Sequence, residues 1–209
     1  MHSDVNLIYQ DDFLLVVGKP ANLLSVPGRG ADKQDCLASH LQRHFPDALV
    51  VHRLDMATSG LMLFARGPLM QSRLSQLFRE RRVVKRYQAI VAGKPAFASG
   101  EIDLPLICDW PNRPRQKVCF QTGKPALTRY CVLEEVEHGS AMTSRLELEP
   151  VTGRSHQLRL HLASIGHPIV GDALYGGLPA HRMMLHASEL HFDHPASGES
   201  MSFFMVTEF

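Results

Sequence analysis

The sequence contains little that would indicate a secreted, disulfide-bonded or membrane protein. Its four cysteines include no Cys-x-x-Cys pair, and nothing points to a secreted context that would favour disulfides, so reduced thiols are expected. The first residues lack a basic segment followed by an apolar one. No apolar run approaches the roughly 20 residues that a membrane-spanning helix needs. The sequence therefore predicts a cytoplasmic protein.

The densest groups of histidines lack the spacings typical of metal sites. The chain has 12 histidines, but its densest groups, within residues 156–167 and 186–194, contain no His-x-x-x-His pair and lie near no cysteine pair. Zinc sites in proteins usually show one of these spacings. A structural zinc site is therefore not predicted.

The chain has almost no net charge, at +1, which argues against binding to nucleic acid through overall charge. Apolar residues make up 44% and charged residues 21%, values typical of folded globular proteins. A chain of 209 residues can bury about 70% of its unfolded surface in a substantial core. Because no repeat, low-complexity segment or linker interrupts the sequence, we expect one domain over residues 1–209.

The cations are unevenly distributed. Residues 66–86 contain seven of them against the single acid Glu80, and a second cluster follows at residues 113–124. Basic runs this short are usually solvated surfaces. Two clusters flanking one site would also suit a polyanion, because phosphate contacts need local cations rather than a high net charge.

Residues 51–60 read Val-His-Arg-Leu-Asp-Met-Ala-Thr-Ser-Gly and precede an apolar run at residues 61–65. Asp55 lies between a basic pair and a Thr-Ser-Gly turn, an arrangement that can keep a carboxylate ionised and directed at a ligand. Alternatively, Asp55 bonds the backbone amides of Thr58 or Ser59 in an Asx-type turn. This stretch alone does not decide between the two.

The hydrophobic pattern predicts an α+β protein. Apolar periodicity and breakers place helices at residues 36–44, 68–79 and 155–164, the last with Ser155 as its N-cap. Alternating or wholly apolar runs place strands at residues 6–10, 13–17, 59–66, 85–91, 128–135, 144–149, 185–192 and 201–205. Short strands, hairpins and few helices favour α+β over strict βαβ alternation. In the strand at 85–91, Tyr87 shares a face with Ala89 and Val91.

Four blocks of the sequence resemble the RluA-type RNA pseudouridine synthases. They occur in the family's order and span most of the chain: His-Arg-Leu-Asp-Met-Ala-Thr-Ser-Gly at 52–60, Lys85-x-Tyr87, Gly-Lys-Pro-Ala-x-Thr-x-Tyr at 123–130, and residues 152–161 continuing into 166–172. The resemblance implies a mixed, mostly antiparallel sheet with flanking helices and a central cleft, and no metal or organic cofactor. We expect no N-terminal S4-type RNA-binding domain, which members of the family often carry, before Lys19.

The same resemblance implies that the chain isomerises specific uridines of structured RNA to pseudouridine. Residues 24–28 and 106–118 look most like those members with dual specificity, whose RNA partners are 23S ribosomal RNA and the anticodon stem-loop of transfer RNA. No membrane and no obligate protein partner is implied.

Three residues carry the implied chemistry. Asp55 is the catalytic carboxylate that promotes cleavage of the N-glycosidic bond, Arg154 holds it ionised and oriented, and Tyr87 stacks on the uracil and removes its C5 proton. Departure of uracil builds positive charge at C1′, which a fixed carboxylate can stabilise. The alternatives are a phosphate-binding role for Arg154 and a core position for Tyr87.

The remaining site residues are implied to contact RNA. Arg53 would fill the stack that the target base leaves, unless it forms a surface salt bridge. His52 would support the loop by hydrogen bonding. Trp110 would either stack on RNA or pack against the protein. The predicted RNA-contacting residues are Arg53, His52, Lys19, Lys85, Arg113, Arg115 and Lys117. Gly18 stands where the family commonly has Asn, which leaves the geometry of that turn open.

Two other functions are compatible with parts of this pattern. A glycoside or nucleoside hydrolase would use Asp55 together with a second acid that activates water, for which Asp172 is the candidate. An RNA-binding module would carry the same loop without catalysis.

Overall fold

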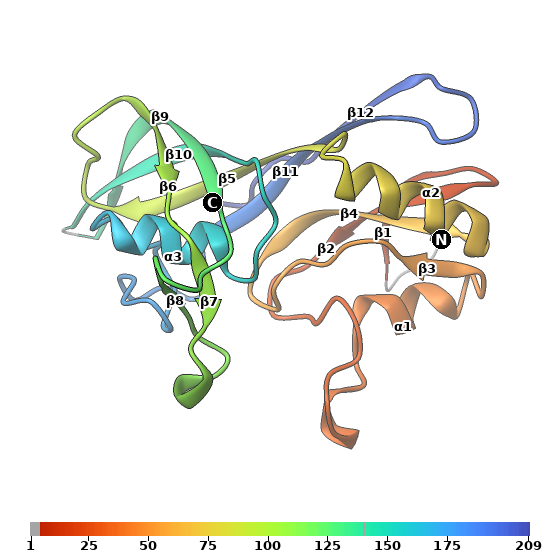
Figure 1. Cartoon of the computed structure of the whole chain (residues 1–209), viewed down its shortest axis with the longest axis horizontal. Helices are drawn as coiled ribbons and strands as arrows, with labels where there is room; N and C mark the ends of the chain where they lie inside the picture. The colour runs from red at the N-terminus through yellow and green to blue at the C-terminus, as the bar shows by residue number, and fades with distance from the viewer. Residues whose placement is uncertain (1–4, 140) are drawn as a thin grey trace. The chain divides into compact units, whose positions relative to one another are not determined.

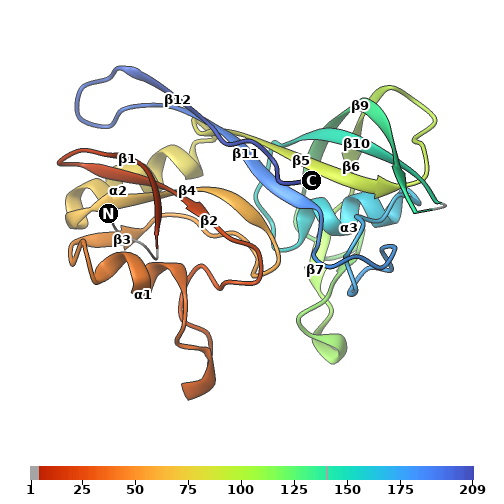
Figure 2. The ribbon, with the colours of Figure 1, turned by 180° about the vertical axis from the view of Figure 1, so that it is seen from behind.

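The computed structural model describes residues 5–139 and 141–209, which pack into two compact units (Figures 1 and 2). The first unit holds the described residues up to Lys85 together with 187–208, and the second holds residues 86–186 and Phe209. The chain crosses from one unit to the other inside strand β5 (Val84–Ala92) and returns inside strand β11 (Leu185–Asp193).

The first unit is built on antiparallel strands. Strand β2 (Leu14–Lys19) lies between β1 (Asn6–Gln10) and β4 (Ser59–Arg66), while β3 (Ala48–Val50) pairs with the end of β4. Strand β12 (Ser200–Phe204) pairs with β11. Every residue of β2 and nearly every residue of β4 is buried, as expected for wholly apolar runs.

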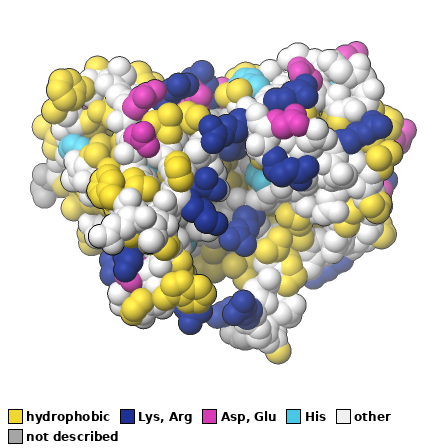
Figure 3. All heavy atoms as spheres, viewed as in Figure 1, with side chains coloured by type: hydrophobic (Ala, Val, Ile, Leu, Met, Phe, Trp, Pro, Cys, Tyr) yellow, Lys and Arg dark blue, Asp and Glu magenta, His cyan; other side chains and the backbone are white. Residues whose placement is uncertain are grey.

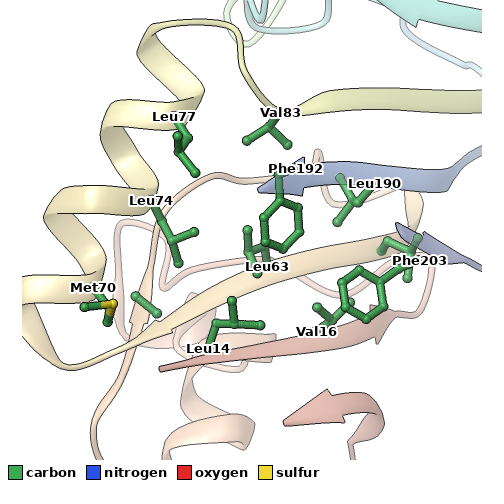
Figure 4. Close-up of a cluster of buried hydrophobic side chains, with 12 residues drawn as sticks. Leu14, Val16, Leu63, Met70, Leu74, Leu77, Val83, Leu190, Phe192 and Phe203 are labelled. Atoms are coloured by element: carbon green, nitrogen blue, oxygen red, sulfur yellow. The ribbon is translucent and has the colours of Figure 1, made fainter. Parts of the chain in front are cut away.

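Two α-helices cover these strands. Helix α2 (Gly67–Arg79) has Pro68 in its first turn, where a missing N–H costs nothing, and directs Met70, Leu74 and Leu77 into the core. Each large apolar side chain buried there contributes about 1.5–3 kcal/mol. Figure 4 shows these side chains meeting Leu14, Val16, Leu63, Val83, Leu190, Phe192 and Phe203. Helix α1 (Leu37–Gln42) is shorter than predicted, and it begins after Cys36 because Cys36 and Ser39 form a reciprocal cap at its start. A 3-10 turn, η1 (Ala31–Lys33), comes before this helix in the chain.

The second unit contains a four-stranded antiparallel arrangement in the order β5, β10 (Ala141–Pro150), β9 (Leu127–His138), β6 (Ser99–Asp103). In β10, Leu146 and Leu148 are buried, whereas the charged residues that alternate with them, Arg145, Glu147 and Glu149, are half-buried. A separate hairpin consists of β7 (Leu106–Cys108) and β8 (Gln116–Val118), with the 3-10 turn η2 (Trp110–Asn112) at its tip.

Helix α3 (Gln157–Ser164) has its N-cap one residue later than predicted. His156, not Ser155, is the residue before the helix, and its backbone is left-handed, with φ of 53°. The Gln157 side chain explains the change, because its Oε1 accepts from the backbone N–H of Arg154 at 3.0 Å and fixes the chain just before the helix. Ser155 is therefore not the N-cap.

The class and most elements are confirmed. The strand pairs within each unit are antiparallel and the helices are few, as in an α+β fold. The prediction missed β3, β6, β7 and β8, which have only three to five residues. Within the part of the chain that the structure describes, no helix has the length and apolar character needed to cross a bilayer.

Candidate active site

Asp55 lies in the loop between β3 and β4, and the residue before it is fixed at both backbone polar atoms. The Ser25 hydroxyl donates to the Leu54 carbonyl at 2.7 Å and accepts from the Leu54 N–H at 3.1 Å. Both residues are buried. Because these bonds are shielded from water, the backbone entering Asp55 has one position.

The residue after Asp55 is fixed by Lys19. Its side chain is completely buried, and its ammonium donates to the carbonyls of Pro20, Leu23 and Met56 at 2.8, 2.7 and 3.0 Å. An ammonium has three donors, and three carbonyls receive them here. The prediction that Lys19 contacts the RNA backbone is therefore wrong; Lys19 anchors the Asp55 loop from inside the protein.

The turn after Asp55 closes through the backbone. The Thr58 N–H donates to the main-chain carbonyl of Asp55 at 3.1 Å, and Thr58 and Ser59 are buried. Gly60 follows with φ of 113°, and a Cβ there would lie 2.3 Å from the Ala187 carbonyl oxygen of β11. Only glycine fits both constraints. The half-buried Asp55 side chain thus projects from a loop held on both sides.

His52 supports this loop, as predicted. Its ring stacks on Phe78 with centroids 4.6 Å apart, and Nε2 accepts from the Leu63 N–H at 2.9 Å. Burial and the positive charge of Lys85 lower the pKa of His52 to about 3. The ring is therefore neutral near pH 7, consistent with a structural role and no proton transfer.

The other two cations of this region differ in exposure. Arg53 is exposed, whereas Lys85 is half-buried at the start of β5. Burial lowers the pKa of Lys85 below its usual value. Their contacts with RNA remain predictions.

In the second unit, Tyr87 is half-buried on β5, opposite Leu148 of β10. Ala89 and Val91, two and four residues further, are fully buried. The predicted strand is thus present, and its tyrosine lies where the buried part of the strand begins.

Two arginines of the motif at residues 152–161 have opposite environments. Arg154 is exposed, and its Nε donates to the Pro125 carbonyl at 3.1 Å. Arg159 is buried in α3 and forms a bidentate ion pair with Asp172, with Nε to Oδ2 at 2.7 Å and Nη2 to Oδ1 at 2.8 Å. Sequence reasoning missed Arg159, although a cation between Leu158 and Leu160 on an apolar helix was a signal.

The pair with Arg159 also changes the interpretation of Asp172. Its carboxylate is 1% exposed, bonds the guanidinium through both oxygens and accepts from the Leu174 N–H at 3.0 Å. A second acid in a hydrolase must reach a water molecule. Asp172 is therefore a structural partner of Arg159 and not that acid.

A buried polar network surrounds the start of α3. Gln157 Oε1 accepts from the Thr152 hydroxyl and from Arg154 N–H, while its Nε2 donates to Leu127 O and Thr128 Oγ1 at 2.9 and 3.0 Å. His161 continues the network, with Nδ1 at 2.9 Å from Thr128 Oγ1 and Nε2 at 3.0 Å from Leu104 O. These motif side chains therefore build the fold of the second unit.

The remaining predicted RNA contacts lie on the β7–β8 hairpin. Arg113, Arg115 and Lys117 are exposed there, and Figure 3 shows basic and hydrophobic side chains together on this hairpin, at the lower left. Trp110 is 65% exposed, so it is not packed in a core. Over residues 5–139 and 141–209, no three histidine, cysteine or acidic side chains come together as metal ligands would.

Comparisons with known proteins agree with this arrangement. The family model described as RNA pseudouridylate synthase matches residues 13–164. The dual-specificity RNA pseudouridine synthase RluA of Escherichia coli strain K12 is 50% identical over 207 residues, covering 97% of this chain and 93% of that protein. The protein of the same name from Vibrio parahaemolyticus is 50% identical over 210 residues, covering 98% and 84%. The solved structure of human RNA pseudouridylate synthase domain containing 1 has a TM-score of 0.85 at 29% identity, covering 100% and 86%.

Proposed function

Because the chain belongs to the RNA pseudouridylate synthase family, we propose that it isomerises uridines in two classes of RNA, 23S ribosomal RNA and the anticodon stem-loop of transfer RNA. The reaction class follows from the family: the chain is an isomerase that acts on RNA. The two substrate classes are supported by relatives at 50% identity whose name records dual specificity.

The reaction changes the uracil atom that is bonded to C1′ of the ribose, and it removes one proton from the base and returns one. The N1–C1′ bond of uridine breaks, the uracil turns in its pocket, and a C5–C1′ bond forms. C5 then loses its proton and N1 gains one, so no co-reactant is consumed. The target base must leave the RNA stack before any of this occurs.

We assign the carboxylate to Asp55. The observation that carries this assignment is the fixed loop, in which Ser25 holds Leu54 and the buried Lys19 holds Met56 on either side of the acid. A carboxylate on a preorganised loop stabilises developing positive charge without reorganising in the reaction. Tyr87 is the proposed acceptor of the C5 proton and the stacking partner of the uracil.

We propose Arg154 as the residue that holds Asp55 ionised and oriented, as the family resemblance implies. Arg159, in the same motif, is buried and bonds both carboxylate oxygens of Asp172, so its guanidinium has a structural partner. Arg154 is exposed. A contact to RNA phosphate is its alternative role.

Product analysis tests the reaction and its substrates. Transcripts of 23S ribosomal RNA fragments and of anticodon stem-loops, labelled with tritium at uridine C5, are incubated with the protein. We expect tritium release from both RNA classes with no loss of uracil. Free uracil in place of isomerised uridine would establish a hydrolase, and binding without tritium release would establish an RNA-binding module.

The role of Arg154 is tested by separating affinity from turnover. Arg154→Lys keeps the charge but loses the planar fork, so we expect slower turnover of bound RNA with little change in affinity. Weaker RNA affinity with a reduced salt dependence and unchanged turnover of bound RNA would instead assign Arg154 to an RNA phosphate.

A further inference from the structure

The chain's only tryptophan lies at the tip of an exposed arm. This arm, residues 106–118, consists of β7, η2 and β8, and it projects from the second unit at the lower left of Figure 1. Trp110 is 65% exposed. Exposed indoles are uncommon in folded proteins, because burying a tryptophan removes a large apolar area from water.

The base of the arm is fixed to the unit. Leu106 is buried with Ala126 and Leu160, and Val118 packs against them. Leu106 and Lys124 exchange two backbone hydrogen bonds of 3.0 and 2.8 Å, and the Gln116 N–H donates to the Tyr175 hydroxyl at 2.8 Å. The arm is therefore an ordered element that presents its tip in a defined position.

The tip is closed by bonds that do not involve the indole. The Asp109 N–H donates to Arg115 O, the Arg115 N–H to Asn112 O and the Asn112 N–H to Asp109 O, all at 2.9–3.0 Å. The Asn112 amide also donates to the Asp109 carboxylate at 2.8 Å. Because the turn holds itself together, Trp110 is not needed to fold it.

One cation lies against the indole. The guanidinium carbon of Arg113 is 4.5 Å from the ring centroid, a cation–π contact that orients the ring without burying it. The arm carries two further cations, of which Arg115 bonds the Leu174 carbonyl and Lys117 lies 3.7 Å from Asp109. The tip therefore offers an aromatic face beside the guanidinium of Arg113, on an arm with further cations.

We propose that Trp110 stacks on an unpaired base of the RNA substrate. This proposal rests on the proposed function and specifies how the same enzyme holds its RNA. An aromatic face beside a guanidinium matches a single-stranded nucleotide, whose base stacks while its phosphate is neutralised. Extruding a uridine also leaves neighbouring bases unstacked, and an indole on a fixed arm can replace a lost stacking partner.

The intrinsic fluorescence of the native protein tests this directly, because Trp110 is its only tryptophan. The protein is titrated with a stem-loop RNA and, separately, with a fully paired duplex of equal length. We expect the stem-loop to quench the emission with the same midpoint as the anisotropy of labelled RNA, and the duplex to leave it unchanged. Unchanged emission at saturating stem-loop RNA would overturn the proposal.

Variants measure the contribution of the stack. Trp110→Ala should weaken stem-loop affinity by about 5- to 150-fold, the range for one base–aromatic stack, while Trp110→Phe keeps most of the affinity. Phe97→Ala is the matched control, because Phe97 is 73% exposed on the same unit but lies outside the arm. Equal affinities of Trp110→Ala and Phe97→Ala would contradict the proposal. Thermal melting checks that both variants are folded.

Turnover separates this proposal from the function on which it rests. The Trp110 contact is made before and during the reaction, so the turnover of bound RNA should be retained in Trp110→Ala. A selective loss of that turnover with unchanged affinity would contradict a binding role for Trp110. Absence of isomerisation by the wild-type protein contradicts the proposed function instead, because quenching requires no turnover.

Discussion

Two long motifs of the chain, residues 51–60 and 152–161, are held in place in opposite ways. The first is fixed largely from outside, because Ser25 and Lys19 bond its backbone. The second bonds itself and β9 through its own side chains, with Gln157 at the centre. A run of closely spaced motif residues can therefore contain residues that serve catalysis or residues that stabilise the fold. The predictions below test this difference.

The largest effect is expected at the buried ion pair of the second motif. Arg159→Met leaves the carboxylate of Asp172 buried without its cation, which should cost about 4 kcal/mol in the free energy of unfolding. Arg154→Ala, which alters an exposed arginine five residues earlier, should change that free energy by less than about 0.5 kcal/mol. Urea unfolding measures both, and equal losses would remove the distinction between these arginines.

The next effect is expected at Gln157. Gln157→Leu removes four hydrogen bonds and leaves buried partners unsatisfied, so the free energy of unfolding should fall by about 3 kcal/mol. Turnover per folded molecule should be unchanged if the residue is structural. The exposed Gln121→Leu is the control. A turnover loss in Gln157→Leu at full folding would show that Gln157 itself contributes to the chemistry.

Lys19→Met tests the outside support of the first motif. Three carbonyls lose the donor that the buried Lys19 supplies, which should lower the free energy of unfolding by about 2 kcal/mol. Displacement of Met56 should also slow single-turnover isomerisation by up to about 100-fold, because small misplacements of a catalytic group are costly. Lys33→Met, at an exposed lysine, should behave as wild type. A loss of stability without a loss of rate would show that Lys19 stabilises the fold but does not position Asp55 for the reaction.

The smallest effect near neutral pH is that of two histidines, one in each motif, whose contribution appears only as the pH falls. Burial lowers the pKa of His161, and burial with the charge of Lys85 lowers that of His52 to about 3. Below pH 6.5 the unfolded chain binds protons that the folded chain does not, so stability falls as pH falls, by at most about 1.4 kcal/mol per pH unit for each histidine. Stability should not depend on these groups above pH 6.5.

Urea unfolding between pH 7 and 4 measures this slope. His52→Gln should make it shallower, whereas His181→Gln, at an exposed position, should leave it unchanged. Equal slopes for wild type and His52→Gln would contradict the lowered pKa of His52.

Much of the fold could be predicted, because long apolar runs such as β4 and the proline-started helix α2 carry strong local signals. A strand of three residues, such as β7, is too short to show a hydrophobic period and forms because it pairs with a neighbouring strand, here β8. No linker was visible between the two units because the chain crosses within β5 and β11, whereas domain boundaries usually lie in exposed linkers.

The candidate site was predicted less completely, for a physical reason. Residue type alone does not reveal burial, so Lys19 was interpreted as a phosphate contact although its ammonium is enclosed by carbonyls. Arg154 and Arg159 are likewise the same residue type, and the sequence does not show that Arg154 is exposed whereas Arg159 forms a buried ion pair. Spacing located the motifs, and the packing around each side chain distinguished their roles.

Asp55→Asn tests the central claim most directly, because Asn is nearly isosteric and removes only the charge. Single-turnover tritium release from C5-labelled RNA is compared with that of Asp12→Asn, an exposed position in the β1–β2 turn. We predict that Asp55→Asn binds RNA and melts as wild type does but releases no tritium, while Asp12→Asn is fully active. Release by Asp55→Asn at the wild-type rate would contradict the account.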